Sequence, residues 1–491
     1  MQFIFDHFGT ITDAVKGHRV VASELAAAAR AGAAKLAALG AKPGANVLIC
    51  HGGTPRFFAD LFAVWTSGAA ASCLNPETTA SELERIVDFL KPVAVLVDGE
   101  GEGSTGGCPV IDLSNIFSGR EVAPIAASLD DDALILFTSG TTGEPKGVVL
   151  TFRALLARMA LNRAFIGNLD LAITLCVLPT HFGHGLIGNS LTPLFAGADL
   201  VLAAGNNLKS VARLGDIVDH FGVTFLSSVP AFWKLALKAA KPPRQAKLSR
   251  IHIGSAPLSA QVWSAVMDWS GTRKVVNMYG LTEAANWIAG ASADEQEPQD
   301  GLIGRVWGGA AALRGEDGRL SATGEGDLVV QTPSLMKGYL HRADLTAVAL
   351  RDGWLSTGDA GRIDADGMIR LTGRRKHEIN RAGLKVHPED IDILLERHPD
   401  ISESCAFGMP DPIMGEAVGV AVVLNEGSRI DVKALRAWTA ERLVAEKIPD
   451  SWYIVSQIPK SDRGKVSRDQ VSRACRDNAA ASAVRAPGDA A

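Results

Sequence analysis

The sequence has few cysteines, and their placement excludes the sites that cysteines most often build. Its six cysteines are scattered along 491 residues, with no Cys-x-x-Cys pair and no paired spacing. The pattern indicates neither a structural zinc site nor a disulfide framework. It is typical of a protein from a reducing compartment.

Long apolar runs and a strong net charge are also missing. No stretch approaches the roughly 20 apolar residues of a membrane span, and the N-terminus has no basic segment followed by an apolar one. The net charge of -5 gives no general attraction to nucleic acid or anionic lipid. We therefore expect a cytoplasmic protein without a membrane span or a nucleic-acid partner. A homodimer is left open.

The chain is longer than one hydrophobic core usually accommodates, so more than one domain is expected. From residue 20 to about 97, helical patterns alternate with short apolar runs, which is typical of a parallel sheet covered by helices. Ser23 is the expected N-cap of the first helix. Helices are predicted over 24–39, 56–67 and 80–90, and strands over 47–50, 70–74, 94–97 and 133–137.

The residue pattern changes beyond residue 300. Gly- and Asp-punctuated stretches beyond residue 300 predict a β-rich part over about 300–375, and an α+β pattern follows from Pro388. The predicted organisation is a body over 1–375, a small domain over 377–476 and a disordered Ala-rich tail over 477–491.

A loop rich in hydroxyls and glycines follows the strand predicted at 133–137. It reads Thr138-Ser-Gly-Thr-Thr-Gly-Glu-Pro-Lys146-Gly, and such a loop can surround a polyphosphate with N–H groups, hydroxyls and a cation. It is not a Walker A loop, because Pro145 precedes the lysine and Gly147 follows it.

Further motifs occur in a fixed order. They are Tyr279-Gly280-Leu281-Thr282-Glu283, 324–328, Gly338-Tyr339, WLSTGDAGR at 354–362, Gly373-Arg374 and IPKSDRGK at 458–465. Together with the loop, they resemble the motifs of the adenylate-forming superfamily, which includes acyl-CoA synthetases, peptide-synthetase adenylation domains and firefly luciferases. The resemblance covers about residues 20–470. It implies an α/β fold with a large N-terminal body of α/β subdomains, a β-rich subdomain and a small mobile α+β C-terminal domain.

The resemblance also implies a nucleotide site. Tyr279 would stack on adenine, and Asp359 with Arg374 would bind the ribose. Glu283 and Thr141 would hold Mg²⁺, and Thr282 would donate to the α-phosphate. The implied ATP-binding residues are Thr138, Ser139, Gly140, Thr141, Thr142, Gly143, Lys146, Ser255, Ala256, Pro257, Asn277, Met278, Tyr279, Gly280, Thr282, Asp359 and Arg374.

By the same resemblance, Lys465 would stabilise the transition state in which a carboxylate attacks the α-phosphorus, with Thr282 and Glu283 as the other catalytic residues. Lys376 would be the hinge about which the small domain rotates before the thiol step. The pantetheine arm of coenzyme A would pass beside Ala382 and Gly383.

The implied acyl pocket departs from the family pattern. The segment Pro179-Thr-His181-Phe182-Gly-His184-Gly exchanges an aromatic residue and a histidine. His181 and His184 have no third ligand beside them, so no zinc is assigned. Two indoles near the pocket favour a short or aromatic acid over a long chain. The implied pocket residues are Phe182, His184, Phe232, Trp233, Gly254 and Trp287.

The predicted function is ATP-dependent activation of a carboxylic acid to acyl-AMP, with pyrophosphate release, followed by acyl transfer to coenzyme A. ATP, Mg²⁺ and coenzyme A are the implied cofactors. The alternative is a stand-alone adenylating enzyme that loads a carrier-protein pantetheine or an amine. A binding module without catalysis is disfavoured because Lys146, Glu283, Asp359, Arg374 and Lys465 are all present. Luciferase-like oxygenation shares these motifs, which leave it open.

Overall fold

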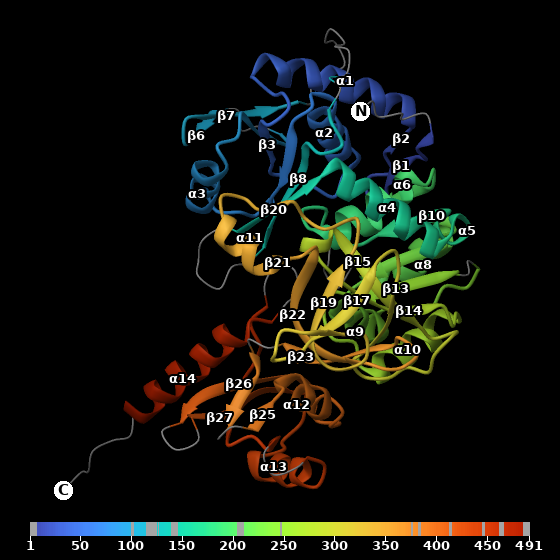
Figure 1. Ribbon diagram of the computed structural model, residues 1–491. Helices are drawn as coiled ribbons and strands as arrows, with labels where there is room; N and C mark the ends of the chain where they lie inside the picture. The colour runs from blue at the N-terminus through green and yellow to red at the C-terminus, as the bar shows by residue number, and fades with distance from the viewer. Residues whose placement is uncertain are drawn as a thin grey trace, which may run out of the picture. The chain divides into compact units, whose positions relative to one another are not determined.

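A computed structural model (Figure 1) describes residues 7–99, 103–113, 125, 127–138, 146–203, 211–245, 248–374, 377–381, 384–411, 415–443, 447–460 and 466–484. By its internal contacts the chain divides into two compact units. The first comprises Met1–Pro298, Ile303–Ala311 and Val329–Ser356, and the second comprises Gln299–Leu302, Ala312–Leu328 and Thr357–Ala491. The domain boundaries expected from the sequence stay a prediction.

The first unit contains a sheet in the strand order β20-β9-β8-β4-β3-β5-β7-β6. Strands β3, β4, β5, β7 and β8 are joined by parallel pairing, as the alternating helices and strands predict. The strands are β3 Asn46–Ile49, β4 Ala70–Cys73, β5 Ala94–Val97, β6 Gly103–Thr105, β7 Cys108–Asp112, β8 Asp132–Thr138, β9 Lys146–Thr151 and β20 Gly338–Tyr339. The helices between them are α1 Ala22–Ala38, α2 Pro55–Thr66 and α3 Ala80–Leu90.

Helix α1 begins differently from the prediction. Its N-cap is Val21, and the backbone N–H of Val21 donates to Glu24 Oε2 at 3.1 Å. The carboxylate of Glu24 thus satisfies the backbone N–H of the N-cap residue. The Ser23 prediction is wrong because Ser23 already lies in the first helical turn.

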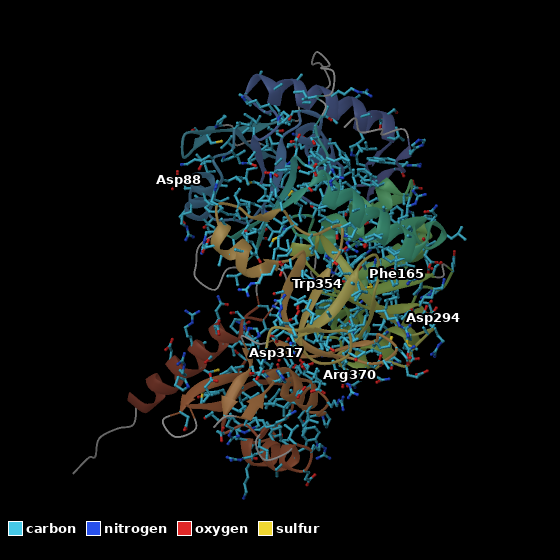
Figure 2. The ribbon with its side chains drawn as sticks, viewed as in Figure 1. Asp88, Phe165, Asp294, Asp317, Trp354 and Arg370 are labelled. Atoms are coloured by element: carbon cyan, nitrogen blue, oxygen red, sulfur yellow. The ribbon has the colours of Figure 1, made fainter. Side chains whose placement is uncertain are left out.

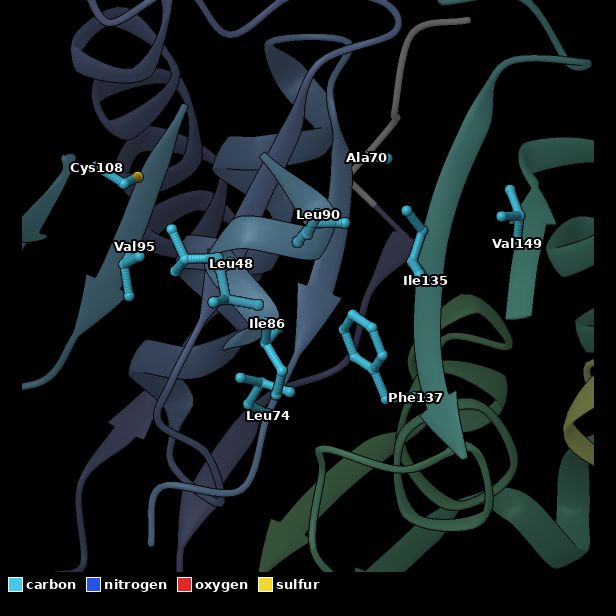
Figure 3. Packing of buried hydrophobic residues seen from close by; sticks show 11 residues of the cluster. Leu48, Ala70, Leu74, Ile86, Leu90, Val95, Cys108, Ile135, Phe137 and Val149 are labelled. Carbon is cyan, nitrogen blue, oxygen red and sulfur yellow. The ribbon is translucent and has the colours of Figure 1, made fainter. Parts of the chain in front are cut away.

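A buried apolar cluster anchors the strand that leads into the phosphate loop (Figure 3). Phe137, the penultimate residue of β8, packs there with Leu74 and with Ile86 and Leu90 of α3. Burying side chains of this size stabilises each position by about 1.5–3 kcal/mol. The last residues before the loop are therefore held by the core.

Within the first unit, a second sheet runs in the order β16-β15-β14-β13-β12-β10-β11-β1-β2. Pairing is parallel along the series β1, β11, β10, β12, β13 and β14. It is antiparallel between β14 and β15 and between β15 and β16. The strands are β1 Ile11–Asp13, β2 Arg19–Val20, β10 Ile173–Cys176, β11 Asp199–Leu202, β12 Phe225–Ser228, β13 Arg250–Gly254, β14 Val275–Leu281, β15 Asn286–Ser292 and β16 Leu302–Val306. The helices are α4 Phe152–Ile166, α5 Asn168–Leu171, the π-helix η3 His184–Leu191, α6 Thr192–Phe195, α8 Leu214–Phe221, α9 Pro230–Ala239, α10 Ala260–Ser270 and the 3₁₀ turn η4 Thr282–Ala284.

Short antiparallel strands follow in the order β18-β17-β19-β22-β23, with β21 beside β22. They form the β-rich part that the turn residues predict. They are β17 Ala310–Arg314, β18 Leu320–Ser321, β19 Gly324–Gln331, β21 Leu350–Arg351, β22 Trp354–Ile363 and β23 Ile369–Arg374, and α11 Ala343–Ala349 precedes β21.

The C-terminal part of the second unit is α+β, as expected. Its sheet has the order β25-β24-β27-β26, with β28 beside β27. The elements are β24 Ile379–Arg381, β25 Leu384–Val386, α12 Pro388–Leu395, β26 Ile401–Asp411, β27 Gly415–Leu424, α13 Val432–Ala440, β28 Ser451–Ile454 and α14 Arg468–Val484. Helix α14 extends into the tail expected to be disordered from residue 477, because alanine has the highest helix propensity and continues a helix that is already nucleated.

All six cysteines lie in the described part of the chain and are free thiols. Of the helices described, none is both long enough and apolar enough to cross a membrane.

Candidate active site

The predicted phosphate loop connects two paired strands. Thr138 ends β8, Lys146 opens β9, and the two are register partners. Lys146 Nζ lies 3.6 Å from the centroid of the Tyr339 ring. The lysine at the C-terminal end of the loop is thus placed over an aromatic face on the neighbouring strand β20.

A short turn carries the predicted metal-binding carboxylate. Thr282 and Glu283 lie in η4, directly after β14. The backbone N–H of Met336 donates to the Glu283 carbonyl at 2.8 Å, and Tyr339 Oη donates to Glu283 Oε1 at 2.8 Å. Burial and the negative charge of Glu283 raise the pKa of Tyr339, so the hydroxyl keeps its proton and acts as the donor. Glu283 is therefore held at its backbone and at its carboxylate.

The strands β13 and β14 lie side by side at the predicted adenine site. Gly254 pairs with Met278, and a Cβ at Gly254 would lie 2.8 Å from the Met278 carbonyl oxygen, so only glycine fits. Tyr279 is buried in β14 beside this pair, with Asn277 and Met278 also buried. Ala256 and Pro257 are exposed.

Ser255, a predicted ATP-binding residue, contacts His184, a predicted acyl-pocket residue. Its φ of 68° is in the left-handed region, which costs a serine roughly 1 kcal/mol or more. Ser255 Oγ lies 2.8 Å from His184 Nδ1, and His184 Nε2 lies 2.6 Å from Ser227 Oγ. The His184 ring is thereby fixed from both nitrogens.

Trp287 packs tightly beside His184. Its ring centroid is 5.2 Å from that of His184 and 5.0 Å from that of His252, and both imidazoles are edge-on to it. A Cβ at Gly188 would lie 2.7 Å from the Trp287 ring, so the indole packs directly on the backbone of η3. Phe165, labelled in Figure 2, packs against the buried cluster that contains Trp287.

The other two aromatic pocket candidates lie on α9. Trp233 is fully buried, and its ring centroid is 5.4 Å from that of Trp269 on α10. Phe232 lies edge-on to Trp233 at 5.9 Å. Trp233 contributes to the packing of α9 on α10, and its role in acid binding stays a prediction.

The predicted ribose pair belongs to the second unit. Asp359 in β22 and Arg374 in β23 are register partners, and Arg374 Nε donates to Asp359 Oδ1 at 2.9 Å. Asp359 is buried, whereas Arg374 is half exposed. The register of one hairpin therefore brings together two residues that separate motifs assign to the same sugar.

Comparison with known proteins identifies the family of this chain. The family model for AMP-binding enzymes matches residues 10–340, and the model for the AMP-binding enzyme C-terminal domain matches residues 390–465. The chain belongs to the AMP-binding enzyme family. As such it is an ATP-dependent acid–thiol ligase, which converts a carboxylic acid to acyl-AMP with release of pyrophosphate and then transfers the acyl group to coenzyme A.

Individual relatives of this AMP-binding enzyme align over most of its length. Oxalate–CoA ligase of Arabidopsis thaliana is 30% identical over 88% of this chain and 89% of its own. Sulfoacetate–CoA ligase of Cupriavidus necator is 34% identical over 69% of this chain and 66% of its own. The ATP-bound crystal structure of MatB from Rhodopseudomonas palustris is 25% identical, covers 97% of each chain and has a TM-score of 0.86.

Some predicted residues of this AMP-binding enzyme lie outside the described residues. They are Ser139, Gly140, Thr141, Thr142, Gly143, Lys376, Ala382, Gly383 and Lys465. Their roles stay predictions.

Other contacts were not indicated by the family motifs. Tyr339 is identified from sequence only as part of a strand, yet it contacts both Lys146 and Glu283. A signal was present, because the chain has only three tyrosines and two of them, Tyr279 and Tyr339, fall in motifs. Ser227, which contacts His184, carries no such signal.

Proposed function

We propose that the acid activated by this enzyme is short, of the size of oxalate or sulfoacetate. The observation that carries this proposal is the packing of Trp287 against His184, His252 and the backbone at Gly188. We expect an indole in this position to block the extension of a long acyl chain past His184. Closely packed aromatic side chains move little to admit a larger ligand, because protein interiors are packed as densely as organic crystals.

The relatives of this enzyme act on acids of different sizes. The oxalate and sulfoacetate ligases act on small acids, whereas a feruloyl-CoA synthase of Amycolatopsis, 29% identical, acts on a larger aromatic acid. The sequence identities of these relatives to this chain are too similar to decide between a short and a long acid. The packing at Trp287 favours the small acids.

In the proposed nucleotide site, Lys146 binds the phosphates, Tyr279 stacks on adenine, and Asp359 with Arg374 binds the ribose. Magnesium would supply positive charge that neutralises the phosphates, and a site with one protein carboxylate fits it, since Mg²⁺ is usually bound by one or two carboxylates plus substrate phosphates. Glu283 offers such a carboxylate, already oriented by Tyr339. The hydroxyl of Thr282 would donate to the α-phosphate.

Lys465 is proposed to act in adenylation alone, with Lys376 as the hinge and Ala382 and Gly383 beside the pantetheine arm. Lys465→Ala should then reduce acid-dependent pyrophosphate release by orders of magnitude, because the attacking carboxylate and the α-phosphate are both anions. A supplied acyl-adenylate should still be converted to acyl-CoA. Equal loss of both half-reactions in a folded variant would contradict this division of roles.

An acid panel tests the proposed substrate class. The enzyme is incubated with ATP, Mg²⁺, coenzyme A and either oxalate, sulfoacetate, malonate, ferulate or a long-chain fatty acid, and acyl-CoA is identified by mass spectrometry. The short acids should have the highest kcat/KM. Higher kcat/KM with ferulate or the fatty acid would refute the proposal.

A variant at Trp287 sharpens the same test. Trp287→Ala should raise the kcat/KM ratio of ferulate to oxalate by about 10- to 100-fold, since apolar pocket contacts discriminate by this much per group. Trp269→Phe, which alters an indole in the packing of α10 on α9, serves as the matched control and should leave the ratio unchanged. An unchanged ratio in Trp287→Ala would show that Trp287 does not limit acid size.

A further inference from the structure

We infer that Tyr339 is a positioning residue that orients Lys146 and Glu283 before MgATP binds. The inference rests on the roles proposed above for these two residues. Neither the sequence motifs nor the relatives assign a role to the Tyr339 side chain.

The backbone around Tyr339 is fixed by its neighbours. Strand β20 pairs with β9 through Tyr339↔Val148. The N–H of Leu340 donates to the Gly147 carbonyl at 2.8 Å, and the N–H of Tyr339 donates to Thr346 Oγ1 at 2.9 Å. The Tyr339 side chain is 8% exposed. The ring therefore has a defined position relative to the first residues of β9.

Two opposite charges meet different parts of the same side chain. The ammonium of Lys146 lies over the ring face, where the quadrupole is negative, and the carboxylate of Glu283 accepts from the hydroxyl at the ring edge. A phenol that donates to an anion becomes richer in electrons, so each contact strengthens the other.

The arrangement has a consequence for nucleotide binding. Without the ring and its hydroxyl, Lys146 loses its cation–π contact and Glu283 loses a hydrogen-bond donor. A phosphate can replace the first contact and a metal ion the second, so Tyr339 can hold both side chains in place without excluding MgATP.

Isothermal titration calorimetry of ATP, with Mg²⁺ and with EDTA instead, tests the inference without any acid. Tyr339→Phe removes only the hydroxyl, so it should weaken MgATP binding about 5- to 10-fold and leave metal-free ATP binding within about 2-fold. Tyr339→Leu also removes the ring and should weaken metal-free ATP binding by about 3- to 10-fold. Tyr453→Phe, at the remaining tyrosine, in the second unit, is the matched control and should change neither.

A double-mutant cycle separates positioning from simple structural support. If Tyr339 acts through Lys146, Tyr339→Leu should have no further effect on metal-free ATP binding in a Lys146→Met background. Equal effects in both backgrounds, or wild-type MgATP affinity in Tyr339→Phe, would overturn the inference. If Lys146→Met and Glu283→Gln alone left ATP binding unchanged, the roles proposed for those residues would be wrong instead. Circular dichroism checks each variant, and the near-isosteric Tyr339→Phe keeps the test decisive should Tyr339→Leu not fold.

Discussion

Two arginines, the fully buried Arg158 and the largely buried Arg468, lie one in each unit and have opposite surroundings. Arg158 in α4 is fully buried, and its partners are the hydroxyls of Thr332 and Ser334, at 2.9 Å and 2.6 Å from Nη2. Burial lowers the pKa of Arg158 to about 9. Its Nη1 has no hydrogen-bond partner among the described residues.

Arg468 in α14 is surrounded by acceptors instead. Nη1 donates to Asp392 Oδ2 and to the Ala406 carbonyl, both at 2.6 Å, and Nη2 lies 3.1 Å from Glu389 Oε1. Burial alone would lower the pKa of Arg468, but the charges of Asp392 and Glu389 outweigh it and raise that pKa. The guanidinium joins α12, β26 and α14.

The comparison teaches that burial of a charge does not by itself say whether the charge stabilises. A buried arginine with two carboxylates cannot be removed without leaving those carboxylates unpaired, whereas one with hydroxyl partners leaves only neutral groups behind. The surrounding groups, and not the arginine itself, decide the cost of a substitution.

The largest effect is expected at Arg468. Arg468→Met should destabilise the second unit by about 3–5 kcal/mol, because Asp392 and Glu389 would stay buried without their cation. Hydrogen exchange of peptides from α12, β26 and α14 measures this cost. Arg473→Met on the exposed side of the same helix is the matched control and should cost less than about 0.5 kcal/mol. Similar losses of stability in Arg468→Met and Arg473→Met would show that the carboxylate partners of Arg468 do not decide the cost of its substitution.

The contribution of Glu389 to stability should depend on pH, because Glu389 is ionised beside Arg468. Burial opposes ionisation of Glu389, but the neighbouring His377, whose Nδ1 lies 3.7 Å from Glu389 Oε1, and the charge of Arg468 outweigh it and lower the pKa from 4.5 to about 2. A lowered carboxyl pKa contributes stability above the unfolded-state value and loses it as the pH falls through the folded-state value. Glu389→Gln should therefore cost roughly 2–3 kcal/mol at pH 7 and progressively less between pH ~4 and ~2.

Urea titrations of wild type and Glu389→Gln, followed by hydrogen exchange in α12 and α14, give this cost at each pH. A cost that does not change with pH would show that Glu389 acts through packing and not through its charge.

The smallest effect is expected at Arg158. Arg158→Met should change the free energy of unfolding by about 1 kcal/mol or less, because it removes a charge that lacks an acidic partner and fills a similar volume. Thr332 Oγ1 keeps its bond to the Gly308 carbonyl, and Ser334 Oγ keeps its bond to the Ala284 carbonyl.

The variant Arg158→Lys tests whether Arg158→Met changes stability little because Arg158 lacks an acidic partner. Arg158→Lys should cost more than Arg158→Met, since the ammonium is more strongly hydrated and has no fork to reach both hydroxyls. Chemical denaturation of the first unit, followed by tryptophan fluorescence, compares the two. If methionine cost more than lysine, the charge at Arg158 would be a net stabiliser.

The sequence predicted what depends on local pattern. The helices α2 and α3 and the strands β4 and β5 lie within a residue of their predicted bounds, because amphipathic period and turn residues are local signals. The N-cap predicted at Ser23 is wrong, since several residues near a helix end can satisfy the backbone groups there.

Long-range pairing could not be predicted in this way. Motifs assigned Asp359 and Arg374 separately to the ribose, but only the register of β22 and β23 joins them. Likewise, the contacts of Tyr339 depend on strand pairing across the sheet, and the Arg468 cluster depends on how α14 packs on β26. Nothing in the spacing of these residues indicates their partners.

The pairing of β20 with β9 also sets an order of events during synthesis. Val149 and its partner Gly338 are about 190 residues apart, and ribosomes add roughly 5–20 residues per second. The edge of β9, with its Val-Val-Leu sequence, therefore waits ~10 to 40 s of translation for its partner strand. Unpaired edges of this kind recruit other chains. A nascent chain stalled in this interval would present that edge to chaperones, and the tyrosine that contacts Lys146 and Glu283 is among the last parts of the first unit to arrive.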